Sequence, residues 1–231
     1  MMNILCFGDS NTFGTNPSGG RWDLHERWPG VLQDELGDDY RIIEEGLGGR
    51  ITVMEDALEG DKCGKRHLPV LLRSHRPLHL VIIMLGTNDM KHRFHMLPVD
   101  IAKGAAHLGE IVKTYPYGEY YPVPRVLLVS PILIRPGISH SPYTGFTEDA
   151  VTVSQQLGNY YRQEAETHHW YYLDAATVAS ASERDKLHME KEDHRALAAA
   201  IAKVIRDCYS SSLCAINFGS PFVSQLTRRQ E

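Results

Sequence analysis

Residues 4–11, ILCFGDSN, join a short apolar run to a group of small polar residues near the start of the chain. The run 4–7 indicates a buried strand, and Gly8 allows the sharp turn that would present Ser10. In open α/β sheets, ligands bind at the carboxyl ends of the strands, which makes Ser10 a candidate nucleophile. Turns also prefer these residue types, so this stretch alone leaves Ser10 open between a catalytic residue and a turn residue.

The same alternation of apolar runs and amphipathic segments continues along the chain. The apolar runs lack a clean in-and-out pattern, which is typical of strands buried on both faces. Strands that are each followed by a helix predict a parallel sheet. We therefore expect an α/β protein built as a three-layer α/β/α sandwich. The expected strands are 4–7, 40–43, 78–85, 126–129 and 170–173, and the expected helices are 28–36, 68–75, 101–115, 149–168 and 191–208.

The length and composition fit one globular domain. Of 231 residues, 42% are hydrophobic and 23% are charged, and a chain of this size suits one large α/β domain. We expect that domain to span residues 1–208. The serine run 210–212 interrupts the last predicted helix, and residues 209–231 form a tail. That tail is either an extension of the same domain or a contact between subunits.

Charge and cysteine usage narrow the class of protein. A formal net charge of −5 gives no electrostatic case for nucleic acid, and no apolar run approaches the roughly 18 residues of a membrane span. The N-terminus lacks a signal-peptide pattern. Cys6, Cys63, Cys208 and Cys214 have neither zinc-ligand nor redox-motif spacing. We expect a cytoplasmic protein with buried, reduced thiols and with neither a nucleic-acid nor a membrane partner.

Two further loops follow predicted strands. The loop 46–49, GLGG, can expose backbone N–H groups to a ligand, as an oxyanion hole or a phosphate cradle does. The loop 86–89, GTND, can aim the Asn88 amide into the same crevice as Ser10, but it is also a good helix start. The local pattern does not decide between an oxyanion hole and a phosphate cradle for 46–49, or between a site residue and a helix start for 86–89.

Asp185 and His188 precede the last predicted helix. An aspartate three residues before a histidine can bond Nδ1 and hold Nε2 toward a nucleophile. The alternative is a capped helix start with solvated histidines. His92 and His95 could suggest a metal site, but no carboxylate or cysteine completes the ligand set, and we expect no metal.

Two loops of unusual composition remain. The loop 130–147 is long for a compact domain and rich in proline and glycine, as functional lids and mobile segments are. The aromatic loop 115–122 is either a contact between subunits or a local core.

Taken in order along the chain, these blocks resemble the SGNH (GDSL-type) hydrolases. The matching blocks are GDS at 8–10, the glycine loop that ends at Gly49, GTND at 86–89, and Asp185 with His188. The bacterial arylesterase and acyltransferase branch is the most similar, through RWPGVL at 27–32, IIEEGL at 42–47 and LVIIMLGTND at 80–89. The resemblance implies a five-stranded flavodoxin-like sheet of order 2-1-3-4-5 and ester cleavage without a metal or an organic cofactor.

The resemblance also implies roles for particular residues. Ser10 would be the nucleophile, His188 the general base and Asp185 its orienting partner. The oxyanion hole would consist of the backbone N–H groups of Ser10 and Gly49 and the side-chain amide of Asn88. Each role is carried over only because the matching residue stands in the matching block.

The chain departs from the family pattern without losing a catalytic group. Asn is usual where Glu45 stands, and Gly is favoured where Lys186 and Asp193 stand. The nucleophile elbow Gly-x-Ser-x-Gly of α/β-hydrolases is absent, because Thr12 occupies the place of its second glycine.

We therefore expect a serine esterase that cleaves short-chain acetyl or aryl esters through an acyl-enzyme on Ser10. Acyl transfer to alcohols is a further expected outcome, and we expect a homo-oligomer. The alternatives are a flavodoxin-like phosphate or nucleotide binder that uses 8–12 and 46–49, and a non-catalytic interaction module. The expected substrate contacts are Asp9, Asn11, Thr12, Trp22 and Ile132, with Met90, Phe94 and Ile134 as further candidates.

Overall fold

The computed structural model describes residues 1–216, with side chains through residue 209. It contains a five-stranded sheet of order β2-β1-β3-β4-β5, in which every neighbouring pair is parallel. The predicted fold class and strand order are confirmed. The strands are β1 (Met2–Gly8), β2 (Tyr40–Gly46), β3 (Leu80–Met84), β4 (Arg125–Ser130) and β5 (Tyr171–Asp174).

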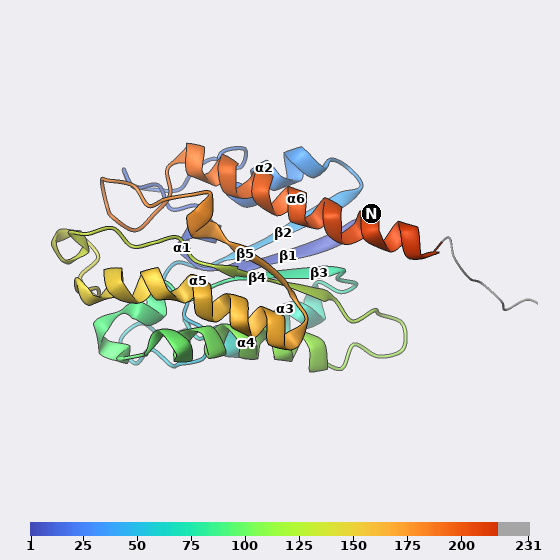
Figure 1. Cartoon of the computed structure of the whole chain (residues 1–231), viewed down its shortest axis with the longest axis horizontal. Coiled ribbons are helices and arrows are strands. Elements are labelled where there is room, and N and C mark those ends of the chain that lie inside the picture. Colours follow the sequence, from blue (N-terminus) through green and yellow to red (C-terminus); the bar gives the residue numbers. More distant parts are fainter. Residues whose placement is uncertain (217–231) are drawn as a thin grey trace, which may run out of the picture.

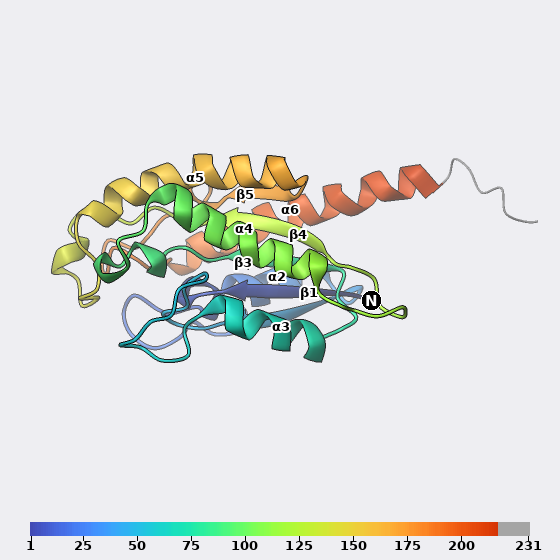
Figure 2. The same cartoon turned by 90° about the horizontal axis from the view of Figure 1, so that it is seen from below.

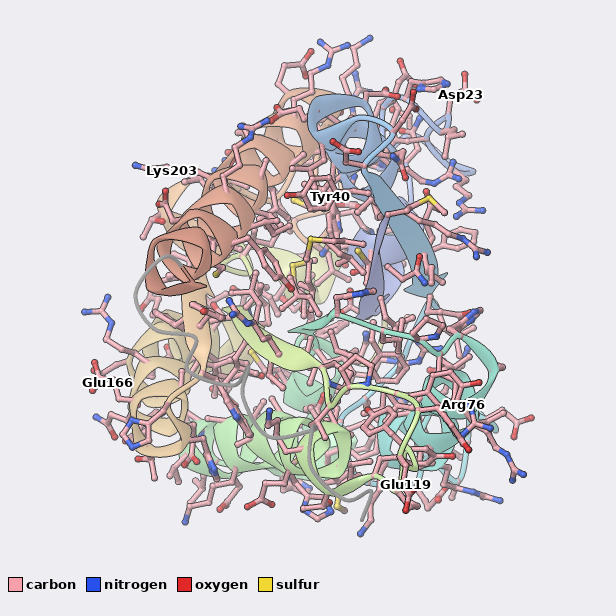
Figure 3. All side chains as sticks on the ribbon, turned by 90° about the vertical axis from the view of Figure 1, so that its right-hand side faces the viewer. Asp23, Tyr40, Arg76, Glu119, Glu166 and Lys203 are labelled. Carbon is pink, nitrogen blue, oxygen red and sulfur yellow. The ribbon has the colours of Figure 1, made fainter. Side chains whose placement is uncertain are left out.

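Helices cover both faces of the sheet, with α2 and α6 on one face and α3, α4 and α5 on the other (Figure 1). Charged side chains such as Glu166 on α5 and Lys203 on α6 point away from the layers (Figure 3). The α-helices are α1 (Ser10–Phe13), α2 (Trp28–Leu36), α3 (Gly64–Ser74), α4 (Pro98–Thr114), α5 (Asp149–His168) and α6 (Lys191–Ile216). The 3₁₀ helices are η1 (Asn88–Met90), η2 (His92–Phe94), η3 (Ile138–His140) and η4 (Ala175–Thr177).

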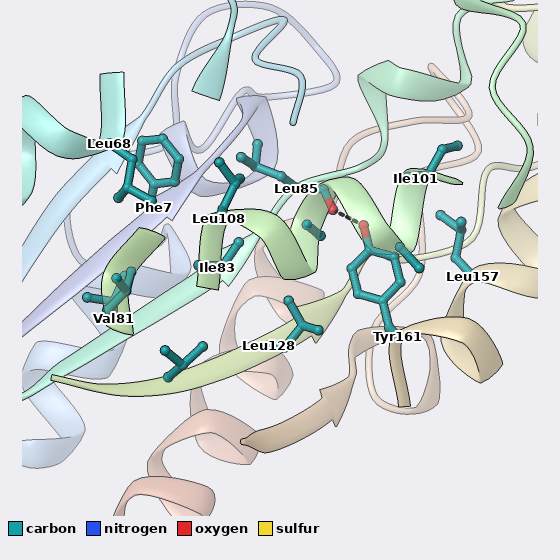
Figure 4. Close-up of a cluster of buried hydrophobic side chains, with 14 of the residues drawn as sticks. Phe7, Leu68, Val81, Ile83, Leu85, Ile101, Leu108, Leu128, Leu157 and Tyr161 are labelled. Atoms are coloured by element: carbon teal, nitrogen blue, oxygen red, sulfur yellow. Dashed lines mark hydrogen bonds between the residues drawn. The ribbon is translucent and has the colours of Figure 1, made fainter. Parts of the chain in front are cut away.

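Each central strand is buried on both sides, which explains the missing in-and-out pattern. In β1, Ile4 packs in the core under α2 and α6, whereas Phe7 packs in the core under α3, α4 and α5. Figure 4 shows part of the second core, where the Tyr161 hydroxyl donates a hydrogen bond of 2.6 Å to the Leu85 carbonyl. This bond fixes the carboxyl end of β3, from which the loop 86–89 departs.

The last helix is longer than the sequence predicts. The prediction ends it at residue 208, but α6 continues through Ile216 and extends past the sheet (Figure 2). Serine is only moderately less favourable than alanine in a helix, so the run 210–212 does not break it. Residues 217–231 of the expected tail lie outside the described residues, and the domain boundary at 208 stays a prediction.

Three expectations about individual groups can be compared with the structure. Cys6, Cys63 and Cys208 are buried, as predicted, and none of the three is joined in a disulfide, whereas the side chain of Cys214 lies outside the described residues. In the aromatic loop, Tyr117 is buried in the core whereas Tyr120 is 90% exposed. Within residues 1–216, the longest apolar stretch of any helix falls short of what a membrane crossing requires.

Candidate active site

The turn after β1 places Ser10 at the first position of α1. Asp9 caps this helix, and its carboxylate accepts a hydrogen bond of 3.0 Å from the Asn11 N–H. A Cβ atom on Gly8 would lie 2.0 Å from Thr12 Oγ1 and 2.9 Å from the Met84 carbonyl oxygen. Only glycine allows this close approach between the strand end and the helix.

Ser10, His188 and Asp185 form a continuous chain of hydrogen bonds. The Ser10 Oγ lies 2.8 Å from His188 Nε2, and His188 Nδ1 lies 2.7 Å from Asp185 Oδ2. Ser10 is 8% exposed, and the other two residues are 2% exposed. A hydroxyl, an imidazole and a carboxylate in this order are the groups that acyl transfer to serine requires.

The surroundings of Asp185 keep it ionised. Its Oδ1 accepts hydrogen bonds from the backbone N–H groups of Leu187, at 3.0 Å, and His188, at 2.9 Å. Burial alone would raise the pKa of Asp185, but the bonds from the His188 side chain and from these two N–H groups outweigh it and lower the pKa. Asp185 is therefore a carboxylate at neutral pH.

The glycine loop and Asn88 face the same cavity as Ser10 and His188. Gly49 has φ +79°, a left-handed conformation that favours glycine. The Asn88 side-chain amide donates one hydrogen bond, of 3.2 Å, to the Arg50 carbonyl oxygen. The cavity has a volume of about 330 Å³, and its walls include Ser10, Gly48, Gly49, Asn88 and His188.

Arg50 ties the glycine loop to the end of β1. Its Nη1 donates a hydrogen bond of 2.9 Å to the Gly8 carbonyl oxygen and another to the Glu45 carbonyl oxygen. The guanidinium also lies 4.2 Å from the centre of the Phe7 ring. Burial lowers the pKa of Arg50 to about 10, with partial compensation from Glu45 and Asp9, so Arg50 stays cationic at neutral pH.

The three departures from the family pattern each have a partner or a backbone signature. Glu45 Oε1 lies 2.8 Å from His75 Nε2, and Asp193 Oδ1 accepts a bond of 2.8 Å from the Ser180 N–H. Lys186 has φ +66°. The family's preference for glycine at the position after Asp185 follows from this left-handed turn.

The cavity wall also includes Glu59, Lys91 and Arg93, residues that the sequence analysis did not select. Glu59 Oε1 lies 2.9 Å from Lys91 Nζ and 2.7 Å from Arg93 Nη2, and Arg93 Nη2 also lies 2.5 Å from Asp56 Oδ2. We call Asp56, Glu59, Lys91 and Arg93 the ion-pair cluster. Lys91 and Arg93 flank His92, so the segment considered for metal binding contributes its cations instead.

Part of the loop predicted to be a lid or mobile segment lines the cavity. Residues 142–146 line it, and the Gly145 carbonyl accepts a hydrogen bond of 2.9 Å from the His92 N–H. The Tyr143 ring contacts the His188 ring edge to face, with the ring centres 4.9 Å apart. In the sequence, the length of the loop 130–147 and its proline and glycine content were what indicated a functional segment.

The five residues expected to contact substrate do not border this cavity. Asp9, Asn11 and Ile132 instead border a closed gap on another side of α1 that has no room for a water molecule, and Thr12 is fully buried. The Trp22 indole donates to the Met189 carbonyl oxygen at 3.1 Å. These five residues lie away from the cavity because it is bordered by the glycine loop and residues 142–146.

The further candidates serve other contacts. Met90 and Ile134 are buried in the core under α3, α4 and α5. The Phe94 ring lies below the Arg93 guanidinium, 5.2 Å from ring centre to Cζ.

Comparisons with known proteins place these features in a wider context. A family model described as the GDSL-like lipase/acylhydrolase family matches residues 6–205. The structure of Est24, a carbohydrate acetylesterase from Sinorhizobium meliloti, is 36% identical with a TM-score of 0.85 and covers 90% of this chain and 100% of that chain. The native aryl esterase of M. smegmatis is 37% identical with a TM-score of 0.83, over 90% of this chain and 99% of that chain. A comparison with curated proteins gave no match.

Proposed function

The chain belongs to the GDSL-like lipase/acylhydrolase family and is a carboxylic ester hydrolase, and we propose that Ser10, His188 and Asp185 are its catalytic triad. The observation that carries the proposal is the contact of 2.8 Å between Ser10 Oγ and His188 Nε2, groups that lie 178 residues apart in sequence. Such a contact between buried groups is what a nucleophile and its general base require.

The triad would act in two steps. Ser10 Oγ attacks the ester carbonyl carbon while His188 Nε2 takes its proton, and Asp185 stabilises the imidazolium that forms. The protonated His188 then gives the proton to the leaving alcohol oxygen, which leaves an acyl group on Ser10. In the second step His188 Nε2 takes a proton from water while the water oxygen attacks the acyl carbon. The bond from that carbon to Ser10 Oγ then breaks, the carboxylic acid leaves, and His188 returns the proton to Ser10 Oγ.

The oxyanion of each tetrahedral intermediate would be held by three donors. These are the backbone N–H groups of Ser10 and Gly49 and the N–H of the Asn88 amide that does not bond Arg50. The fixed position of the loops supports this role, because donors held in place beforehand need no rearrangement during reaction. Removing one such donor typically costs about 10²- to 10³-fold in turnover.

The substrates we propose are esters of a short acyl group such as acetyl. The cavity of about 330 Å³ lies at the small end of ligand pockets, which start near roughly 300 Å³. The charged side chains of the ion-pair cluster that line the cavity favour a substrate whose alcohol group is polar. Residues 142–146 in the cavity wall would limit water near the acyl group, which supports acyl transfer to alcohols as a second outcome.

We propose in addition that the protein forms a homo-oligomer. Exposed apolar side chains support this, among them Leu58 and Leu97, which are 79% and 62% exposed. Light scattering on the purified chain at several concentrations tests it, and a monomer mass throughout would contradict it.

Covalent labelling separates the hydrolase from the nucleotide-binding alternative. A serine-directed fluorophosphonate should modify Ser10, mapped by mass spectrometry, and Ser10→Ala should lose hydrolysis of p-nitrophenyl acetate. Ser18→Ala, at an exposed serine of the same region, is the matched control and should react like wild type. Saturable nucleotide binding without labelling, or wild-type turnover in Ser10→Ala, would overturn the proposed triad.

A further inference from the structure

We propose that Asn11 is a positioning residue that holds the general base His188 against the nucleophile. The proposal rests on the proposed function, in which His188 Nε2 takes the Ser10 proton. Asn11 directly follows Ser10 in α1, but its side chain is 3% exposed and does not line the cavity. It points instead to the segment that carries His188.

The Asn11 amide bonds the chain on both sides of His188. Its Nδ2 donates to the Leu187 carbonyl oxygen at 3.3 Å, and its Oδ1 accepts from the Met189 N–H at 3.1 Å. The orientation of the amide is fixed, because a carbonyl oxygen can only accept and a backbone N–H can only donate. One side chain therefore clamps the two neighbours of the base.

These two bonds complete the hydrogen bonding of residues 187–189, which we call the base segment. The N–H groups of Leu187 and His188 donate to Asp185 Oδ1. The His188 carbonyl accepts from the Ser182 N–H at 2.7 Å, and the Met189 carbonyl accepts from the Trp22 indole at 3.1 Å. Every backbone N–H and C=O of the base segment thus has a partner. Buried backbone groups without a partner are costly, so the conformation of the base segment is closely specified.

The clamp couples the nucleophile to the base. Ser10 and Asn11 are adjacent residues of one helical turn, so a shift of that turn moves the Ser10 hydroxyl and the base segment together. Without the Asn11 amide, the Leu187 carbonyl and the Met189 N–H lose their partners, and the base segment can move relative to Ser10. A misplacement of about 1 Å can cost on the order of 10²-fold in turnover.

Steady-state kinetics of Asn11→Ala with p-nitrophenyl acetate test the proposal, with active sites titrated by a fluorophosphonate. We expect kcat per titrated site to fall by about 10- to 100-fold while KM stays near that of wild type. Acylation and deacylation should both slow, because His188 acts in both steps. A loss of stability alone would lower the number of titrated sites and leave kcat per site unchanged.

Two further variants make the test decisive. Asn3→Ala is the matched control, because the Asn3 amide also bonds a distant backbone carbonyl, that of Pro77 at 2.7 Å, far from the site. It should keep kcat per site. Asn11→Asp has the same shape and retains the acceptor for Met189, but it sets a carboxylate oxygen against the Leu187 carbonyl. It should also lower kcat, and it serves if Asn11→Ala does not fold.

The outcomes separate this proposal from the proposed function. Wild-type kcat in both Asn11 variants, with Ser10→Ala inactive, would overturn the positioning role and leave the triad in place. A raised KM with unchanged kcat would instead make Asn11 a substrate contact and would also overturn it. Activity in Ser10→Ala would remove the premise itself.

Discussion

The two walls of the cavity are built from different kinds of interaction. The wall that carries His188 is held by directional hydrogen bonds between buried groups, and every backbone group of the base segment has a partner. Another part of the wall is held by the ion-pair cluster, in which the Glu59 and Arg93 side chains are 42% and 25% exposed, whereas those of Lys91 and Asp56 are 8% and 1% exposed. Fully buried directional bonds fix a geometry, whereas ion pairs with a solvent-exposed partner contribute less energy and tolerate change. We infer that the first wall sets the rate and the second sets the preference among substrates.

The largest effect is expected from a change at Asp185, which belongs to the buried wall that carries His188. Asp185→Asn removes the charge that stabilises the imidazolium and can present His188 in the wrong tautomer, so kcat should fall on the order of 10⁴-fold. Asp38→Asn, at an exposed aspartate, should have no effect. Turnover of p-nitrophenyl acetate measures both, and near-normal activity in Asp185→Asn would contradict the division between the walls.

A smaller loss is expected from the oxyanion side. Asn88→Ala removes one of three donors and should lower kcat by about 10²- to 10³-fold with little change in KM. The rate of Ser10 labelling by a fluorophosphonate should fall as well, because the tetrahedral phosphorus also places an oxygen at these donors. A variant that loses only affinity would show that Asn88 binds the ground state.

The ion-pair cluster should respond in the opposite way. Glu59→Gln leaves Lys91 and Arg93 with less compensation, so KM for an ester with an anionic alcohol group should fall by about 2- to 5-fold, the size of an exposed ion pair. The kcat should stay near that of wild type. Glu55→Gln, on the same loop but paired with Arg66 at 3.5 Å, is the control. A fall in kcat of Glu59→Gln would show that the two walls are coupled.

The smallest effect concerns stability against acid. The folded pKa of Asp185 lies below its usual value of 3.8, so its contribution is present above that value and is lost as the pH falls through the folded pKa. The contribution of the Asp185 carboxylate to the difference in unfolding free energy between wild type and Asp185→Asn should therefore be present at about pH 5 and shrink below about pH 4. Urea unfolding at several pH values measures it, and a difference that grows toward low pH would contradict the assignment.

The sequence predicted both the parallel sheet and the approach of the proposed triad and oxyanion-hole residues, because loops that follow parallel strands meet at one edge of the sheet. Ser10, Gly49 and Asn88 each follow a parallel strand, and the carboxyl ends of β1, β2 and β3 lie at the same edge. Asp185 and His188 precede the last helix, which the alternating pattern also located. Their catalytic roles stay proposals, because strand order alone does not determine them.

The sequence could not determine which side of a short helix faces the cavity. Asn11 was expected to contact substrate, but its position one residue further along α1 than Ser10 turns its side chain to the base segment. Glu59 lies on an irregular loop without period, so its approach to Lys91 has no signal in the pattern. The run 210–212 suggested a helix end, but α6 continues through it. Helix propensity is a weak predictor for a few residues, because the context of a long helix overrides it.

The single turn of α1 has a consequence for protein design. Consecutive residues of an α-helix point about 100° apart, since one turn takes about 3.6 residues. In α1 this angle directs the Ser10 side chain to the cavity and the Asn11 side chain to the base segment. A transplant of residues 8–13 onto another flavodoxin-like scaffold would therefore import the proposed nucleophile together with a docking point for its proposed base. An error of one residue in the graft would turn both side chains by about 100° and lose both contacts.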